Sequence, residues 1–277
     1  MITNSVQLLK DARGRKKCLA AFNVYNLETI RAVFEVGRRQ DVPIIVAFGE
    51  SYLHHASFDV IAAIFKLLAN GYKNSVVLHL DHCKSLTAIQ DAIKAGFTSV
   101  MYDGSNLPLN QNISNSKEVV DFAHPLGVSV EGELGGLNPE DGRSADENLI
   151  FTDPGQAEAY VSQTNVDSLA VSIGNAHGIY KKAPKLDFIR LESIFQAAKV
   201  PIVLHGCSGI PKADLERAIS IAVAKINVNT EMAIAGGNAI AKTINDAQNK
   251  TVKLNLLMEK AFDEMVLAIE PFVALCK

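Results

Sequence analysis

Cysteine is scarce in this sequence of 277 residues, and its spacing argues against a disulfide-built fold. The four cysteines, Cys18, Cys83, Cys207 and Cys276, include no Cys-x-x-Cys pair. Four in a chain of this length are too few for a disulfide scaffold. We therefore expect a protein of a reducing compartment.

Excess charge and long apolar runs are also missing. The formal net charge is -3, so no strong electrostatic field is available to attract nucleic acid or an acidic membrane surface. No run of about 18 apolar residues occurs, and the segment MITNSVQLLKDARGRKK lacks the apolar core of a signal peptide. These absences predict a cytoplasmic protein that binds neither nucleic acid nor membranes.

Two further absences bear on the fold. No Gly-x-Gly-x-x-Gly follows the first apolar run, where a dinucleotide-binding sheet would carry it, and no low-complexity linker divides the chain. With 48 % hydrophobic and 21 % charged residues, the chain has enough apolar material to bury about three quarters of its unfolded surface. We expect a single domain over residues 1–277.

The sequence does contain a regular alternation of short apolar runs with stretches of helical periodicity. The eight apolar runs, predicted as strands, are 18–24, 43–48, 76–80, 99–103, 128–133, 168–173, 201–205 and 223–228. The predicted helices are 27–39, 57–70, 85–95, 114–124, 154–163, 187–198, 211–221 and 231–246, with an additional C-terminal helical segment at 254–275. Helix starts are indicated by Asn26, Ser85 and Pro211. This order favours an α/β fold, a closed (β/α)8 TIM barrel, over an open doubly wound sheet, which stays the alternative.

Histidines end three of the predicted strands. In a (β/α)8 barrel the C-terminal ends of all strands share one mouth, where active sites lie. His82 ends the third run beside Asp81, and His177 and His205 follow the sixth and seventh. Three imidazoles in one mouth could hold zinc with an open fourth position, which is the geometry of a catalytic site. A lone histidine is more often structural, and we assign that role or a surface position to the other four: His54, His55, His79 and His124.

Small residues follow the last three strands. The segments AHGIY, HGCSG and NVNTE offer free backbone amides, and Ser208 adds a hydroxyl, where such barrels commonly bind a phosphate. Alternatively, Gly178, Gly206 and Gly209 only permit tight turns. Their coincidence with two of the histidines favours a phosphate site.

An acidic, glycine-rich segment runs from Glu131 to Leu149 after the fifth strand. Glu133 ends that strand and is expected near the mouth. The segment could close over a bound ligand, or its carboxylates could form a solvated face, which is the usual fate of such charges.

Six of these strand ends, taken together, resemble one known family. The motifs LHLDHC, YDGS, EGELGG, SIGNAHGIY, VLHGCSGIP and KINVNTEM are similar, in order, to those of the class II metal-dependent ketose-bisphosphate aldolases, over about residues 5–235. Members of that family cleave fructose or tagatose 1,6-bisphosphate. The resemblance implies the same barrel fold and a homodimer or homotetramer. A partner subunit or its own barrel could each cover the apolar C-terminal segment KLNLLMEKAFDEMVLAIEPFVALC.

The resemblance also implies roles for particular residues. The metal, usually zinc, would be held by His82, His177 and His205, with Glu133 as a carboxylate of the metal site. A monovalent cation such as Na⁺ or K⁺ is a further cofactor that it allows. The catalytic residues would be Asp81 and, in the acidic segment, Glu140. The phosphate of dihydroxyacetone phosphate would be bound by Gly178, Gly206, Cys207, Ser208, Asn227, Val228, Asn229 and Thr230.

The chemistry that the resemblance implies is cleavage of a phosphorylated ketose to dihydroxyacetone phosphate and an aldehyde, through a zinc-stabilised enediolate. Asp81 would take the proton of the C4 hydroxyl, and Glu140 would exchange the proton on the carbon of dihydroxyacetone phosphate. This sequence departs from the family pattern at Asn106, often histidine in relatives, and around Pro139, where the loop is shorter. The basic DPR-like segment that helps to hold the far phosphate in relatives is absent. The exact sugar therefore stays open.

Other functions on the same fold predict different residues. A metal hydrolase on the same fold predicts a His-x-His pair at the end of the first strand, and AFNVYN contains none. A non-catalytic aldolase-like partner subunit would be expected to lose part of the metal or acid–base set. An aldolase for a related phosphorylated sugar or sugar acid is a closer alternative, because it would use the same residues.

Overall fold

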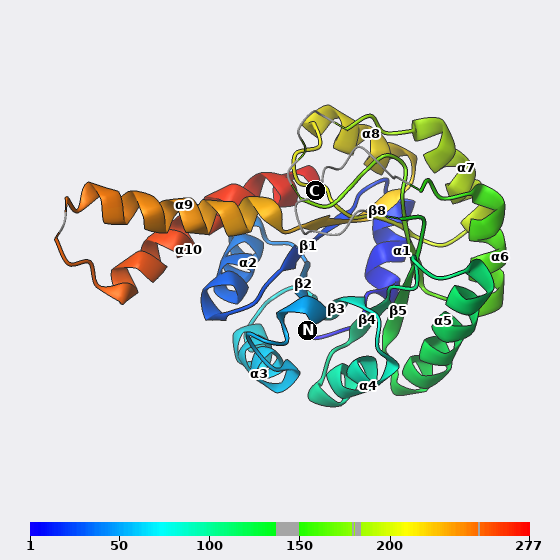
Figure 1. Cartoon of the computed structure of the whole chain (residues 1–277), viewed down its shortest axis with the longest axis horizontal. Coiled ribbons are helices and arrows are strands. Elements are labelled where there is room, and N and C mark those ends of the chain that lie inside the picture. Colours follow the sequence, from blue (N-terminus) through cyan, green and yellow to red (C-terminus); the bar gives the residue numbers. More distant parts are fainter. Residues whose placement is uncertain (137–149, 179, 181–183, 249) are drawn as a thin grey trace.

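The structure, a computed structural model, describes residues 1–136, 150–178, 180, 184–248 and 250–277 (Figure 1). Within these residues, eight parallel strands form a closed barrel in sequence order, in which β8 also pairs with β1. The strands are β1 (Leu19–Asn23), β2 (Ile44–Gly49), β3 (Val76–Cys83), β4 (Ser99–Tyr102), β5 (Ser129–Leu134), β6 (Ser168–Val171), β7 (Ile202–Leu204) and β8 (Val223–Val228). The predicted (β/α)8 barrel is confirmed, and the open sheet is excluded.

Helices surround the barrel, as Figure 1 shows. Those between the strands are α2 (Leu27–Gln40), α3 (Phe58–Ala69), α4 (Leu86–Ala95), α5 (Leu109–Ala123), α6 (Pro154–Thr164), α7 (Phe188–Ala198) and α8 (Lys212–Ile221), with the short 3-10 helices η1 (Glu50–Tyr52) and η2 (His124–Leu126). Two predicted start signals act as caps: the Asn26 side chain accepts from the Thr29 N–H at 3.0 Å, and the Ser85 hydroxyl accepts from the Ala88 N–H at 3.2 Å. Buried apolar side chains between strands and helices form the main core.

Two helices differ from the prediction. The helix α1 (Val6–Gly14) was not predicted, because only Leu9 and Ala12 on it are buried and two residues make a weak apolar period. Leu9 and Ala12 pack against the first residues of several strands, and so α1 closes the N-terminal end of the barrel. The helix α5 begins at Leu109 instead of residue 114, directly after Pro108, through polar turns that carry no clear apolar period.

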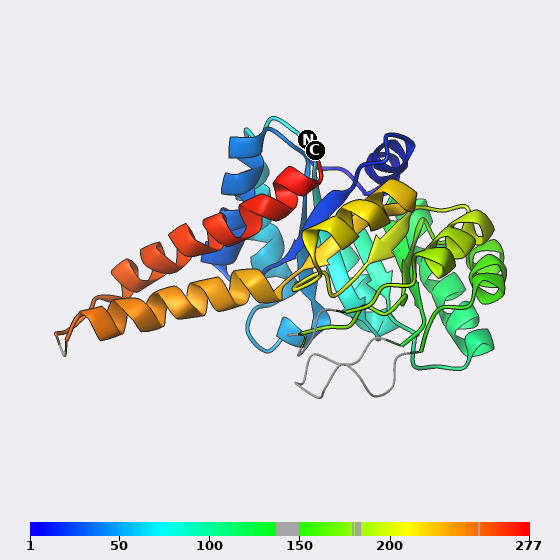
Figure 2. The ribbon, with the colours of Figure 1, turned by 90° about the horizontal axis from the view of Figure 1, so that it is seen from above.

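The chain ends in a helical hairpin. Its two helices, α9 (Thr230–Asp246) and α10 (Leu254–Leu275), pack against each other, and α10 also packs against α2. Figure 2 shows the hairpin projecting beyond the barrel. On α10, Met265 and Ile269 are buried, whereas Leu254 and Leu267 are exposed. Packing on its own chain therefore covers one face of this segment, and contact of the other face with a partner subunit stays a prediction.

The described helices and cysteines give two further findings. No described helix combines the length with the hydropathy that a transmembrane span requires. The four cysteines are free thiols, although Cys18 and Cys276, far apart in the sequence, lie with their Sγ atoms 2.6 Å apart.

Candidate active site

A β-bulge in β3 brings two successive residues to the mouth of the barrel. Side chains normally alternate between the two faces of a strand, which would turn Asp81 and His82 in opposite directions. The pairing of β3 with β4 shifts register between Leu80 and Cys83, and His82 has a φ of 44°, in the left-handed region. As a result, Asp81 and His82 line the same cavities.

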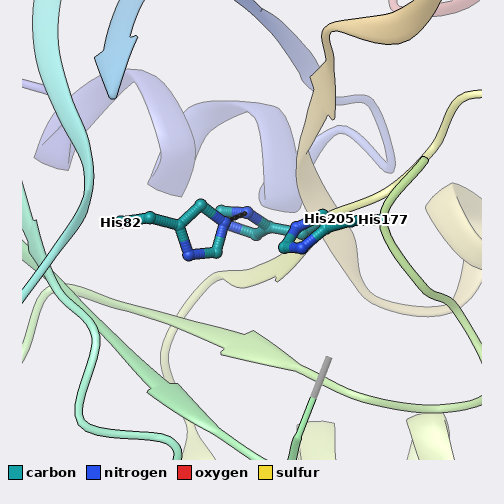
Figure 3. Close-up of side chains that lie close together, drawn as sticks. All are labelled: His82, His177 and His205. Carbon is teal, nitrogen blue, oxygen red and sulfur yellow. Dashed lines mark hydrogen bonds between the residues drawn. The ribbon is translucent and has the colours of Figure 1, made fainter. Parts of the chain in front are cut away.

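The structure brings together three imidazoles from β3 and from the loops after β6 and β7. The ring of His82 lies 4.7 Å from that of His177 and 4.6 Å from that of His205, and the rings of His177 and His205 are 6.0 Å apart, measured between centroids. One ring nitrogen from each lies within 4.8 Å of the other two. Figure 3 shows the three side chains converging from separate segments.

Two of these rings are within hydrogen-bonding distance of each other. His82 Nε2 lies 2.8 Å from His205 Nδ1, and His205 Nε2 donates to the carboxylate oxygen Glu131 Oε1 at 2.9 Å. On its other side, His82 Nδ1 donates to Asp103 Oδ2 at 3.2 Å. Burial would lower the pKa of His82, but the carboxylates of Asp81 and Asp103 outweigh burial and raise it to about 10. His82 is therefore an imidazolium at neutral pH.

The arrangement fits a divalent metal ion. A metal held by His82 and His205 would take the place of the hydrogen bond between these two rings. Burial lowers the pKa of His177 to about 3, so this ring is neutral and offers a lone pair. Three imidazole ligands leave a coordination position for a substrate. Glu131 would orient His205 from its far nitrogen, as carboxylates do for many metal-ligating histidines.

A buried carboxylate beside His82 also indicates a cation. Glu133 Oε2 has no hydrogen-bond partner among the described residues, and it lies 3.5 Å from His82 Nδ1. With Asp103 and His82 it forms a second group of potential ligand atoms within 4.8 Å of one another. Burial, followed by the charge of Asp103, raises the pKa of Glu133. A buried oxygen without a hydrogen-bond partner is unfavourable, and a bound metal ion would give this oxygen a partner.

We expect the metal-free protein to release about one proton when it binds zinc between about pH 6 and pH 8. His82 is protonated throughout this range, because its pKa is raised to about 10, and it must be neutral to bind a metal. The apparent affinity should therefore rise about tenfold per pH unit in this range. Calorimetry in buffers of different ionisation enthalpy would count the protons. An affinity independent of pH would contradict the assignment.

Asp81 is a buried carboxylate held by two amides. The Asn23 side chain donates to Oδ2 at 2.7 Å, and the Asn227 side chain donates to Oδ1 at 3.1 Å. Burial would raise the pKa of Asp81, but the nearby positive charge, chiefly His82, lowers it below its usual range. The carboxylate is therefore ionised and fixed in orientation, as a proton acceptor beside a metal would need to be.

A chain of buried charges lies inside the barrel behind the histidines. Lys225 Nζ donates to Glu131 Oε2 at 2.8 Å and lies 3.2 Å from His79 Nε2. Lys225 and Glu131 are only 1 % and 2 % exposed. His79 donates or accepts through Nδ1 with the Ser99 hydroxyl at 2.8 Å, in keeping with a structural role. The chain connects Lys225, through Glu131, to the candidate metal ligand His205.

Sequence reasoning missed several of these residues: Asn23, Asp103, Glu131 and Lys225. Most of them interrupt apolar runs that form strands, as in AFNVYN, VSVEGE and VAKINV. A polar residue in a strand that is buried on both faces must find a partner inside the barrel. A polar residue inside an apolar run is therefore the sequence signal by which these residues could have been predicted.

Two cavities meet at the histidines. Both are lined by Asn23, Asp81, His82 and His177, and the larger has a volume of about 220 Å³. The smaller extends to residues predicted to bind phosphate: Gly178, Gly206, Ser208, Asn227, Asn229 and Thr230. The helix α9 begins at Thr230, so its N-terminus lies at this cavity. Gly206 has a φ of 61°, and a side chain there would collide with the Ala176 carbonyl.

Two of the predicted phosphate-binding residues, Cys207 and Val228, line neither of these cavities. Cys207 is fully buried, and its thiol donates to the Leu204 carbonyl at 3.1 Å. Val228 is also fully buried, in the core. Glu140 lies outside the described residues.

Comparison with known proteins finds similarity over nearly the whole chain. The sequence model of a family described as fructose-bisphosphate aldolase class-II matches residues 3–277. Among solved structures, the YdjI aldolase from Escherichia coli K12 is 33 % identical with a TM-score of 0.88, and the match covers 100 % of this chain and 97 % of that chain. The fructose-bisphosphate aldolase (Fba) from Campylobacter jejuni has a TM-score of 0.86, covering 99 % of this chain and 95 % of that one. At 22 % identity, this second likeness shows the fold alone.

Proposed function

The chain belongs to the class II fructose-bisphosphate aldolase family and is therefore a lyase of that class, and on this premise we propose its reaction. We propose that it cleaves a phosphorylated ketose, of the fructose or tagatose 1,6-bisphosphate type, to dihydroxyacetone phosphate and an aldehyde with a divalent metal ion, zinc. The observation that carries the proposal is the carboxylate of Asp81, held by two amides, in a cavity that it shares with three converging imidazoles.

The proposed roles follow from charge and position. A zinc ion held by His82, His177 and His205 would act as a Lewis acid and stabilise the negative charge that develops on the ketose oxygens as the C3–C4 bond breaks. Asp81 accepts the proton of the C4 hydroxyl in cleavage and returns it in condensation. Asn23 and Asn227 hold the two oxygens of Asp81, so that the carboxylate does not rotate away from the reacting carbon.

The smaller cavity would take the phosphate of the dihydroxyacetone half. Its lining offers hydroxyl and amide donors, with the N-terminus of α9 at one side. A dianionic phosphate is stabilised by such donors and by the positive end of the helix dipole. Glu140 keeps its proposed role in proton exchange on dihydroxyacetone phosphate.

The presence of Asp81 together with all three histidines weighs against a non-catalytic subunit. Such a subunit would be under no constraint to keep Asp81 fixed by two amides, or to place three histidines within 4.8 Å. A binding-only role would therefore leave this arrangement without an explanation.

Metal removal tests the proposed reaction. We expect the zinc-loaded protein to release dihydroxyacetone phosphate from at least one ketose phosphate, followed with a coupled dehydrogenase. Chelation should abolish the release, and added zinc should restore it, because the metal would stabilise the negative charge that develops on the ketose oxygens. Assays with Na⁺ and K⁺ in turn would test the monovalent cofactor. Full activity after complete metal removal, or no cleavage by the zinc-loaded protein, would overturn the proposal.

A further inference from the structure

The larger cavity lies on the opposite side of the metal ligands from the phosphate cavity. The smaller cavity extends toward the loops after β6 to β8, whereas the larger is bounded by residues that follow β2, β3 and β4. A ketose phosphate that places one end in the smaller cavity and its C3–C4 bond at Asp81 would extend its other half into the larger one. The larger cavity is thus the site of the fragment that leaves as the aldehyde.

The charges that line this cavity are divided. Asp81, Asp103 and Glu133 lie at the metal end. Lys84 lines the same cavity, and among the described residues that line either cavity it is the one lysine or arginine. Away from the metal ligands, Lys84 is therefore the side chain of this cavity that would attract an anionic group on the substrate.

Lys84 is available for such a group. Its ammonium forms no ion pair with any carboxylate that the structure describes, and its side chain is exposed at the cavity. Its backbone is held in place, because its N–H donates to Glu50 Oε2 at 2.9 Å and the preceding residue, Cys83, is fully buried in β3. The neutral side chains of Ser51 and Asn106 line the same cavity and could add hydrogen bonds.

We propose that Lys84 determines specificity for the aldehyde half of the substrate by recognising an anionic terminus on it, a phosphate or a carboxylate. This inference rests on the proposed aldolase function. Lys84 would supply a positive charge to this half of the substrate.

The experiment measures condensation by the zinc-loaded protein. Dihydroxyacetone phosphate is combined with neutral glyceraldehyde, with glyceraldehyde 3-phosphate or with succinic semialdehyde, which carries a carboxylate. The readout is the ratio of kcat/KM for each anionic aldehyde to that for glyceraldehyde. We expect the unaltered protein to favour at least one anionic aldehyde by about tenfold or more. Which of the two anionic aldehydes is favoured shows whether the site recognises a phosphate or a carboxylate.

Two substitutions at Lys84 and one control make the test specific. Lys84→Met should lower the ratio about tenfold, mainly through the KM of the aldehyde, and Lys84→Glu should lower it further. The control is Lys94, an exposed lysine of α4 that pairs with Asp91 and lines neither cavity. The substitution Lys94→Met should leave the ratio unchanged. A ratio that is the same in Lys84→Met, or a preference for glyceraldehyde in the unaltered protein, would overturn the role of Lys84 alone. Failure to condense any aldehyde would overturn the proposed function itself.

Discussion

Asp81→Asn is expected to lower kcat for ketose cleavage by a factor of about 10² to 10⁴, because the amide cannot accept the proton of the C4 hydroxyl. The substitution preserves the volume of the side chain in a site where Asp81 is 3 % exposed. It should also preserve the hydrogen bonds, since Asn227 Oδ1 is buried without a partner among the described residues and could accept from the new amide if the Asn227 side chain flips. Coupled release of dihydroxyacetone phosphate measures the rate.

Two further measurements separate a lost proton acceptor from a damaged site. The zinc content of the Asp81→Asn protein should equal that of the unaltered protein, because the three imidazoles are retained. Exchange of the carbon-bound proton of dihydroxyacetone phosphate with solvent should persist, since we assign that step to Glu140. Equal cleavage rates in the two proteins would refute the role of Asp81. Loss of zinc together with loss of activity would show that Asp81 acts through the metal site.

The second large effect is expected at Glu131. Glu131→Gln leaves the Lys225 ammonium buried in the barrel without its counter-ion, which should lower the free energy of unfolding by about 3 to 5 kcal/mol. It also replaces the carboxylate that accepts from His205 Nε2 with a weaker, neutral acceptor. The affinity for zinc should therefore fall by about 10 to 100 times. Urea unfolding of the metal-free protein and competition with a chelator measure the two effects.

The double variant Glu131→Gln with Lys225→Met distinguishes the two roles of Glu131. Removing both charges should restore most of the lost stability, because no unpaired ion then remains buried. Zinc affinity should stay low, since His205 still lacks its carboxylate. A double variant as unstable as Glu131→Gln alone would show that the ion pair is not the source of the stability. Recovery of zinc affinity in the double variant would show that Glu131 does not act through His205.

The barrel could be predicted from the sequence because each strand is a short apolar run between helices of clear period. A helix or strand can be predicted in this way only when enough of its side chains are buried to give a regular apolar pattern. The helix α1 contributes only Leu9 and Ala12 to the interior, and the first turns of α5 are polar. Both were missed or misplaced for that reason.

The candidate site was only partly predictable. The three histidines and Asp81 stand at strand ends, where barrel topology alone indicates a shared mouth. The charges behind them could not be placed, because a Lys225–Glu131 contact depends on the register between strands that are not adjacent in the sequence. The contact between His82 and Asp103 has the same origin, in the bulge that turns His82.

That bulge also limits how this protein can vary. In a regular strand, Asp81 and His82 would occupy independent positions on opposite faces. Here the positions of both side chains depend on the same irregular backbone in β3. Any insertion, deletion or stiff β-branched replacement at that point would displace both groups together. New substrate preferences are thus expected to arise in the segments that follow the strands, while the backbone at residues 80–83 stays fixed.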